Sequence, residues 1–126
     1  MAAINTGVSY ESVPFALTGT GTTDVYTCGD DGESWLDLAG VMVVDPAGAV
    51  LTAAKVEWYD ISATTAYTLV PATVGLPTAS ENLVFVCEPT IRMRVGDEIR
   101  VTGASGHHVI TTFAKGRTDP GAQAQR

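Results

Sequence analysis

Residues 91–114 read IRMRVGDEIRVTGASGHHVITTFA, and this stretch decides the fold class of the chain. Apolar residues alternate with arginine or threonine on both sides of the dipeptide Gly96-Asp97, at residues 91–95 and 99–102. Alternation with a period of two is typical of a β-strand with one buried face. Glycine and aspartate favour tight turns because they tolerate the backbone conformations that turns need. The stretch therefore predicts a β-hairpin that is followed by a last strand.

The composition of the whole chain also favours strands over helices. Its 126 residues include 17 Thr and 15 Val but only 6 Glu and 2 Lys, and β-branched residues fit a pleated sheet better than a helix. The 13 Gly and 6 Pro are spread along the sequence, and they supply turn signals roughly every ten residues, as in sandwiches and barrels. We therefore expect an all-β protein, a single β-sandwich or jelly-roll-like domain of about eight or nine short antiparallel strands.

Two further runs predict strands that are buried on both faces. These runs are apolar throughout, as expected where both faces of a strand are covered, and they are residues 40–44 (GVMVV) and 83–87 (LVFVC). Residues 45–48 (DPAG) carry aspartate, proline and glycine in the order of a tight turn. They predict a second hairpin, which joins the run at 40–44 to a strand within residues 49–60.

The predicted domain spans residues 8–115. Its first strand contains Pro14, which cannot donate a hydrogen bond to a neighbouring strand and so marks an edge strand. We expect residues 1–7 to form an N-terminal arm and residues 116–126 to form a flexible C-terminal tail. The chain has no apolar run of membrane-spanning length and no visible signal peptide, so we expect no membrane partner and synthesis in the cytoplasm.

Cys28 and Cys87 each lie in a run of strand character. Cytoplasmic thiols stay reduced, so two buried free thiols are expected. The pattern leaves a disulfide open, since one would form only if the two Cα atoms lay roughly 5.5–6 Å apart.

The net charge of −7 is unevenly distributed. Residues 1–60 hold nine acidic residues and only Lys55, whereas residues 61–126 hold six basic and five acidic residues. Binding of nucleic acid needs a clustered basic surface, so no nucleic-acid partner is expected. The asymmetry is consistent with contact between copies of the chain, acidic surface to basic surface, and equally with simple solubility.

The side chains that could support catalysis or metal binding lack the necessary arrangement. The acidic residues within positions 30–37 do not follow the order of a calcium-binding loop. His107 and His108 are adjacent, so in a strand they point to opposite faces and cannot ligate one ion. The chain has no nucleophile elbow and no phosphate-binding glycine motif. We expect no catalytic residue, no metal and no cofactor, and hence a protein that is not an enzyme.

Aromatic and arginine side chains are the candidates for contact with a partner, because these residue types dominate the binding energy of protein interfaces. Trp58 and Tyr59 are neighbours, so at most one of them points into the core and the other is available for contact. The candidate partner-binding residues are Ile4, Trp35, Tyr59, Arg92, Arg94, Arg100 and Arg117.

Residues 91–114 resemble the C-terminal part of many short virion proteins of tailed bacteriophages. Those proteins end in an apolar strand, a Gly-Asp turn, a strand of the type I-x-V-T, a loop of small residues and a last strand of the type H-V-x-x-T-F. A central strand of the type V-x-W also recurs in them. The matching residues are Gly96, Asp97, Ile99, Val101, Thr102, Ala104, His108, Val109, Thr112 and Phe113, with Val56 and Trp58 in the central strand.

The resemblance implies a structural virion protein. Its leading form is a capsid decoration, or cement, protein that binds the major capsid protein or other virion proteins at the capsid surface and stabilises the shell by bridging capsid subunits. Closed symmetry suggests a homo-oligomer, with a trimer as the first expectation. A neck, connector or tail accessory protein is the second interpretation. The third is a small carbohydrate-binding module, in which Trp35 or Tyr59 would stack on a sugar.

Overall fold

The secondary structure consists of strands. The structure is a computed structural model that describes residues 8–19, 21–45, 54–71 and 83–116. Its strands are β1 (Val8–Ala16), β2 (Thr22–Thr27), β3 (Trp35–Val44), β4 (Lys55–Asp60), β5 (Thr65–Val70), β6 (Leu83–Arg94), β7 (Glu98–Thr102) and β8 (His108–Gly116). These residues include no helix long and apolar enough to cross a membrane. The expected arm and, apart from Gly116, the expected tail lie outside the described residues.

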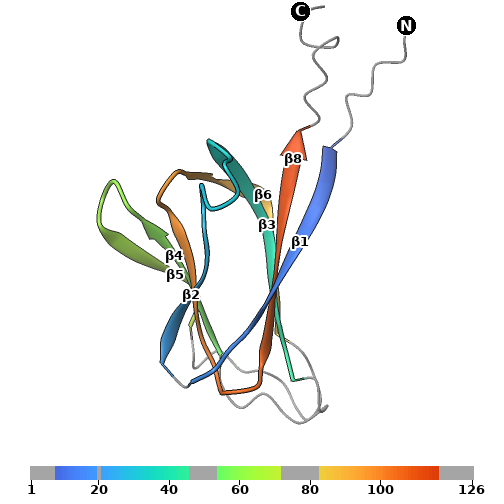
Figure 1. The fold of residues 1–126 in the computed structure, drawn as a ribbon, viewed down its shortest axis with the longest axis vertical. Coiled ribbons are helices and arrows are strands. Elements are labelled where there is room, and N and C mark those ends of the chain that lie inside the picture. The colour runs from blue at the N-terminus through green and yellow to red at the C-terminus, as the bar shows by residue number, and fades with distance from the viewer. Residues whose placement is uncertain (1–7, 20, 46–53, 72–82, 117–126) are drawn as a thin grey trace, which may run out of the picture.

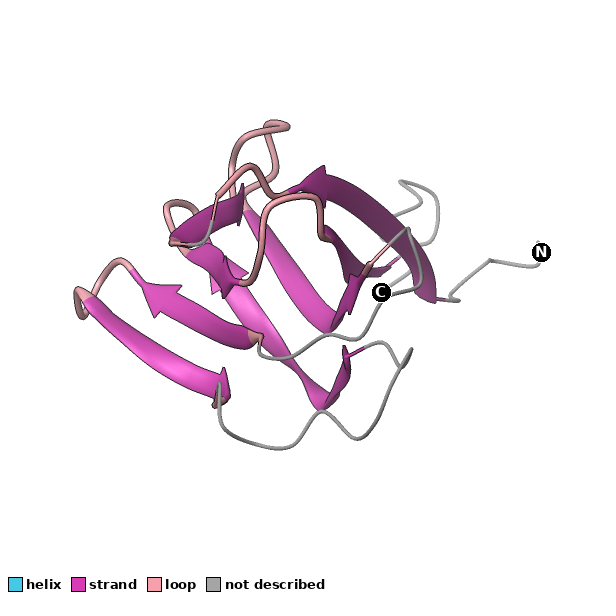
Figure 2. Cartoon of the chain, turned by 90° about the horizontal axis from the view of Figure 1, so that it is seen from below, coloured by secondary structure: helices cyan, strands magenta, loops and turns pink. Residues whose placement is uncertain are grey.

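The strands form two sheets of four strands each, which face each other as the layers of a β-sandwich (Figure 1). Sheet A has the strand order β1-β8-β3-β6, and sheet B has the order β2-β7-β4-β5. All strand pairs are antiparallel, and a view from below shows the described connections between strands as loops (Figure 2). The architecture confirms the predicted all-β sandwich, and β1, which contains Pro14, is an edge strand as predicted.

Side chains of both sheets meet in a core between the layers. Every second residue of a strand points inward, as the period of a strand requires. Phe113 of β8 packs against Tyr26 of β2, with ring centroids 4.9 Å apart, and so links the two sheets. The side chains with no exposed surface are Leu38, Val43, Val56, Met93, Ile99, Val101 and Val109.

The two predicted hairpins are wrong as strand pairs, although the turn at Gly96-Asp97 exists. The amide of Asp97 donates to the carbonyl of Arg94 (2.9 Å), and Gly96 has a φ of +97° that favours glycine. However, β6 lies in sheet A and β7 in sheet B, so the turn carries the chain from one sheet to the other. Val95 lies at this crossing and is 58% exposed, although its alternation predicted burial. The strands on either side of residues 45–48, β3 and β4, also lie in different sheets.

The strands that do form a hairpin are β4 and β5. Asp60 holds their turn, because its Oδ1 atom accepts hydrogen bonds from the amides of Ser62 (2.9 Å) and Ala63 (3.3 Å). Trp58 stacks on Tyr67 across the two strands, with ring centroids 5.4 Å apart. A turn motif reverses the chain locally, but burial of the apolar faces decides which sheet receives the next strand.

Both cysteines are buried free thiols, as expected. Burial raises the pKa of the Cys87 thiol to about 11, and burial is also the main cause that raises the pKa of Cys28. A thiolate in apolar surroundings loses its hydration, so the protonated form is favoured. Both side chains therefore serve as unreactive packing groups.

The expectation that residues 40–44 and 83–87 are buried on both faces is wrong. Alternate residues of both runs point into the core, but Met42 is only half-buried, and Val84 and Val86 are 56% and 64% exposed. A two-layer sandwich covers one face of each strand, and no described residue covers the outer face of β3 or β6 in its place. The apolar outer face of sheet A therefore needs another explanation.

Candidate interaction surface

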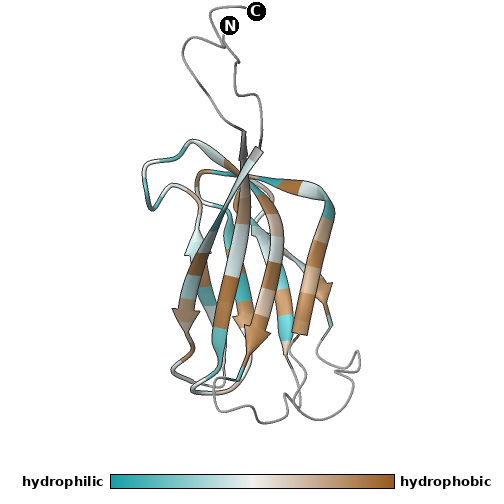
Figure 3. Ribbon diagram, turned by 90° about the vertical axis from the view of Figure 1, so that its right-hand side faces the viewer, coloured by the Kyte–Doolittle hydropathy of each residue, from teal (hydrophilic) through white to brown (hydrophobic). Residues whose placement is uncertain are grey.

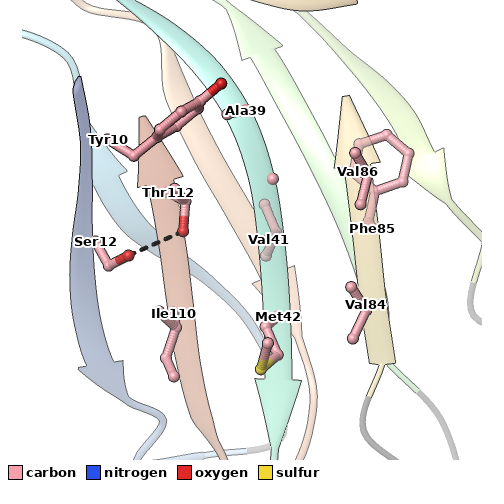
Figure 4. Close-up of a pocket in the computed structure, with 11 residues that line it drawn as sticks. Tyr10, Ser12, Ala39, Val41, Met42, Val84, Phe85, Val86, Ile110 and Thr112 are labelled. Atoms are coloured by element: carbon pink, nitrogen blue, oxygen red, sulfur yellow. Dashed lines mark hydrogen bonds between the residues drawn. The ribbon is translucent and has the colours of Figure 1, made fainter. Parts of the chain in front are cut away.

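Cross-strand neighbours on the outer face of sheet A form two uncharged rows. Residues directly opposite each other in antiparallel strands point to the same face, and a hydrogen bond of 3.0 Å joins two hydroxyls of the second row (Figure 4). The first row contains Pro14, Ile110, Met42 and Val84, and the second contains Ser12, Thr112, Gly40 and Val86. We call these two rows, together with the neighbouring Tyr10 and Ala39, the apolar face.

The apolar face is hollowed into a shallow groove of about 330 Å³, which Val41 and Phe85 also line. Figure 4 shows Tyr10 extending from β1 across β8, and Val84 and Val86 on β6 at the other side of β3. Tyr10 is 68% exposed, and Val84 and Val86 are also largely exposed. Single exposed apolar residues are ordinary on a protein surface, but a contiguous group of them marks an interaction site.

The outer face of sheet B is charged. Lys55 and Glu57 form an ion pair of 3.2 Å, and Arg100 and Glu98 form one of 2.8 Å. The guanidinium of Arg100 also lies 3.8 Å from the ring centroid of Tyr59. In contrast, hydrophobic segments recur along the strands of sheet A in the view that turns this sheet to the reader (Figure 3). The sandwich thus has one apolar and one charged outer face.

Trp35 and Arg92, two of the predicted partner-binding residues, lie at one end of the apolar face. The guanidinium of Arg92 lies 3.9 Å from a ring centroid of Trp35, and its Nε atom donates to Asp37 Oδ1 at 2.6 Å. Asp37 lies opposite Ala114, which in turn lies opposite Tyr10, so this ion pair borders the apolar face. The two charges neutralise each other there.

Of the other predicted partner-binding residues, Arg94 is brought next to this pair, because it lies opposite Trp35 in the register of β3 and β6 and lines a cavity together with Arg92. Tyr59 and Arg100 lie on the outer face of sheet B. Arg94 lines a small polar cavity of about 140 Å³, and Ile4 and Arg117 lie outside the described residues. The binding role of all these residues stays a prediction.

The polar cavity beside Arg94 is also lined by Trp58, Asp60, Arg92 and Asp97. The indole Nε1 of Trp58 is buried and has no hydrogen-bond partner among the described residues. The carboxylates of Asp60 and Asp97 already accept hydrogen bonds from backbone amides. Such a cavity typically holds ordered water that satisfies the unpaired donor.

The acidic loop between β2 and β3 is folded on itself. The hydroxyl of Tyr26 donates to Glu33 Oε1 (2.7 Å), which also accepts the amide of Gly29 (2.8 Å). Burial opposes ionisation of Glu33, but these hydrogen bonds outweigh it and lower the pKa of that carboxyl.

His107 is buried, and its Nδ1 atom accepts the amide of Ala104 (3.2 Å). No group of three or more His, Cys, Asp or Glu among the described residues could hold a metal ion.

Sequence reasoning did not identify the apolar face, although a signal for it was present. Residues 40–44 and 83–87 are apolar throughout in a chain of 126 residues. A domain of that size builds two layers, in which each strand keeps one face toward solvent. A strand with apolar residues on its solvent face is therefore a candidate for contact with another protein.

No family model matches this chain, and no curated protein matches it. Among solved structures, the capsid asymmetric unit of cyanophage Pam1 is similar to it, with 18% identity, coverage of 90% of this chain and 91% of that chain, and a TM-score of 0.35. At this TM-score the similarity is weak.

Proposed function

We propose that this chain is a structural virion protein of a tailed bacteriophage that decorates the capsid. It binds the major capsid protein, bridges capsid subunits, and acts without catalysis, metal or cofactor. The observation that carries the proposal is the contrast between the apolar face of sheet A, which has the Arg92–Asp37 ion pair only at its border, and the outer face of sheet B, whose strands carry the ion pairs Lys55–Glu57 and Arg100–Glu98. A protein that coats a shell needs one face for the shell and another for water.

The residues of the apolar face suit contact with a protein shell. Burying apolar surface contributes roughly 25 cal/mol per Å², and the face offers Tyr10, Val84 and Val86 as largely exposed side chains. An unpaired charge is costly to bury, and neither row of the face contains one. The segment that resembles phage virion proteins supplies Ile110 and Thr112 to the same face.

The two alternatives differ in what the structure offers them. A neck, connector or tail accessory protein would use the same apolar face, so only the position and copy number on the particle separate it from a decoration protein. A sugar platform needs open aromatic faces, but Arg92 lies over Trp35 (3.9 Å) and Arg100 lies over Tyr59 (3.8 Å). The carbohydrate-binding interpretation is therefore less favoured.

Binding to capsids assembled without this chain tests the proposal. Val86→Lys places a charge at the β6 end of the apolar face, and Val95→Lys is its matched control, because Val95 is exposed to a similar extent (58% against 64%) and lies outside that face. We expect the parent and Val95→Lys to co-sediment with capsids and raise their resistance to heat, and Val86→Lys to do neither. Equal binding of both variants, or no gain in heat resistance with bound parent, would overturn the proposal.

A further inference from the structure

The edges of the two sheets are protected to different degrees. The edge strands are β1 and β6 in sheet A and β2 and β5 in sheet B. An exposed edge presents backbone N–H and C=O groups that can pair with another strand. Proline, charge and irregular register oppose such pairing. These features occur at Pro14 in β1, at Glu88 and Pro89 in β6, and at Asp24 in β2, where the register shifts.

Strand β5 carries neither the charge nor the proline of the other edges, and its one register shift, at Leu69, leaves residues 65–68 in regular register with β4. It reads TAYTLV and contains no charged residue, proline or glycine. Residues 65–68 are exposed, and among the described strands β5 pairs only with β4. Threonine, tyrosine and valine favour strands, so β5 is a ready template for an added strand.

The hairpin that carries β5 is held in place. Trp58 stacks on Tyr67 at 5.4 Å between ring centroids, which fixes β5 on β4. The carboxylate of Asp60 caps the turn, and Asp97 Oδ1 accepts the amide of Ile61 at 3.0 Å, which ties the turn to the rest of the domain. A preorganised edge loses little conformational entropy when a strand is added.

We propose that β5 pairs with β5 of a second copy, antiparallel across a two-fold axis. Two copies of sheet B, each of four strands, then join into one continuous sheet. An edge that pairs with itself requires a two-fold axis, so the assembly is a dimer in place of the trimer that the resemblance suggested. The pairing concerns this chain alone and does not rest on its role on a capsid.

The absence of charge on β5 makes this edge a place where two copies can meet without bringing like charges opposite each other. Each copy carries a net charge of −7, so two copies repel unless their charges stay apart. In the β5 pair the uncharged strands lie at the centre, and Lys55 and Glu57 of β4 lie one strand behind them. The two β4 strands are then three strand spacings apart, or ~14 Å, which exceeds the Debye length of ~8 Å at physiological salt.

Sedimentation over a range of concentrations tests the pairing with the full-length chain. The double variant Ala66→Lys/Thr68→Lys places two cations on β5, and Thr68 lies opposite Glu57, so the monomer gains a compensating neighbour. The matched control is Ser34→Lys/Val95→Lys, which makes the same charge change at exposed positions outside β5. We expect a reversible dimer for the parent and the control, and a dissociation constant at least about tenfold higher for the β5 variant.

Hydrogen exchange of the backbone amides in residues 65–70 gives a second measurement. Their protection should increase with the concentration of the parent chain and should not do so in the β5 variant. A parent that stays monomeric, or a β5 variant that dimerises like the control, would contradict the proposal. Fast exchange in the pure chain with protection only on capsids would assign the edge to a strand of another protein and likewise overturn it. Val86→Lys should dimerise normally, which separates this test from that of the proposed function.

Discussion

Gly40 of β3 lies against the backbone of β6, so that a Cβ atom built on it would lie 2.9 Å from the carbonyl oxygen of Phe85. The register between the two strands shifts beside it, between Leu38 and Gly40. A bulge inserts an extra residue and bends the strand, and glycine allows the close approach of the two backbones. This contact fixes the pairing that holds β6 in sheet A.

Gly40→Ala should therefore destabilise the protein. The added methyl group meets backbone that cannot move aside without a strand shift, so we expect the free energy of unfolding to fall by about 1–3 kcal/mol. Urea denaturation measures the change. Gly21→Ala is the control, because nothing lies within 4 Å of its Cβ position, and its effect should be close to zero. Similar losses in both variants would contradict the close contact.

Two aromatic side chains of sheet A should differ sharply in their contribution to stability. Phe113 is 1% exposed and packs against Tyr26, whereas Tyr10 is 68% exposed on the apolar face. Phe113→Ala leaves a cavity in the core and should cost about 3–5 kcal/mol of unfolding free energy. Tyr10→Ala should change it by no more than about 0.5 kcal/mol. A large loss in Tyr10→Ala would show that this side chain packs in the isolated chain.

Asp97 joins the crossing between the sheets to the tip of the β4–β5 hairpin. It is 3% exposed, and its carboxylate accepts the amides of Ile61 and Arg94, each at 3.0 Å. Asp97→Ala removes both acceptors, and each amide left unpaired costs about 1–3 kcal/mol. Thermal unfolding should therefore show a large loss for Asp97→Ala and a smaller one for Asp97→Asn, which keeps one acceptor oxygen. Equal losses would indicate that packing, not hydrogen bonding, carries the effect.

The sequence predicted the class of the fold and the turn at Gly96-Asp97, but neither the turn of the β4–β5 hairpin nor the pairing of the strands. The turn at Gly96-Asp97 could be predicted because its conformation depends on those residues themselves. The choice between a hairpin and a crossing depends on which apolar faces the two following strands can bury, and those contacts join residues far apart in the sequence. A local pattern does not contain that information.

Residue type predicted contact residues that lie at most at the border of the candidate site, and the site itself was found by geometry. Tryptophan and arginine are typical interface residues, but Trp35 and Arg92 contact each other and lie only at the border of the apolar face. Met42 and Ile110 come from strands distant in the sequence, and only the register of sheet A places them opposite each other, with Tyr10 farther along the same face. Their common surface could not be read from any one segment.

The thiol of Cys87 makes stability depend on alkaline pH. Its pKa is raised by burial from 9.0 to about 11 in the folded chain, whereas the unfolded thiol ionises near its ordinary pKa. Below pH 9.0 both states are protonated and the stabilising contribution of the buried neutral thiol is complete. As the pH rises toward about 11 the unfolded state loses its proton first, so the free energy of unfolding falls.

Urea denaturation at about pH 8 and about pH 10 should show this fall in the parent chain and a smaller one in Cys87→Ala, where Cys28 is unchanged. A thiol-labelling reagent should react slowly with folded parent chain and rapidly once urea unfolds it. Fast labelling of Cys87 in the folded chain, or an equal pH dependence in both proteins, would contradict the burial that the structure assigns to this side chain.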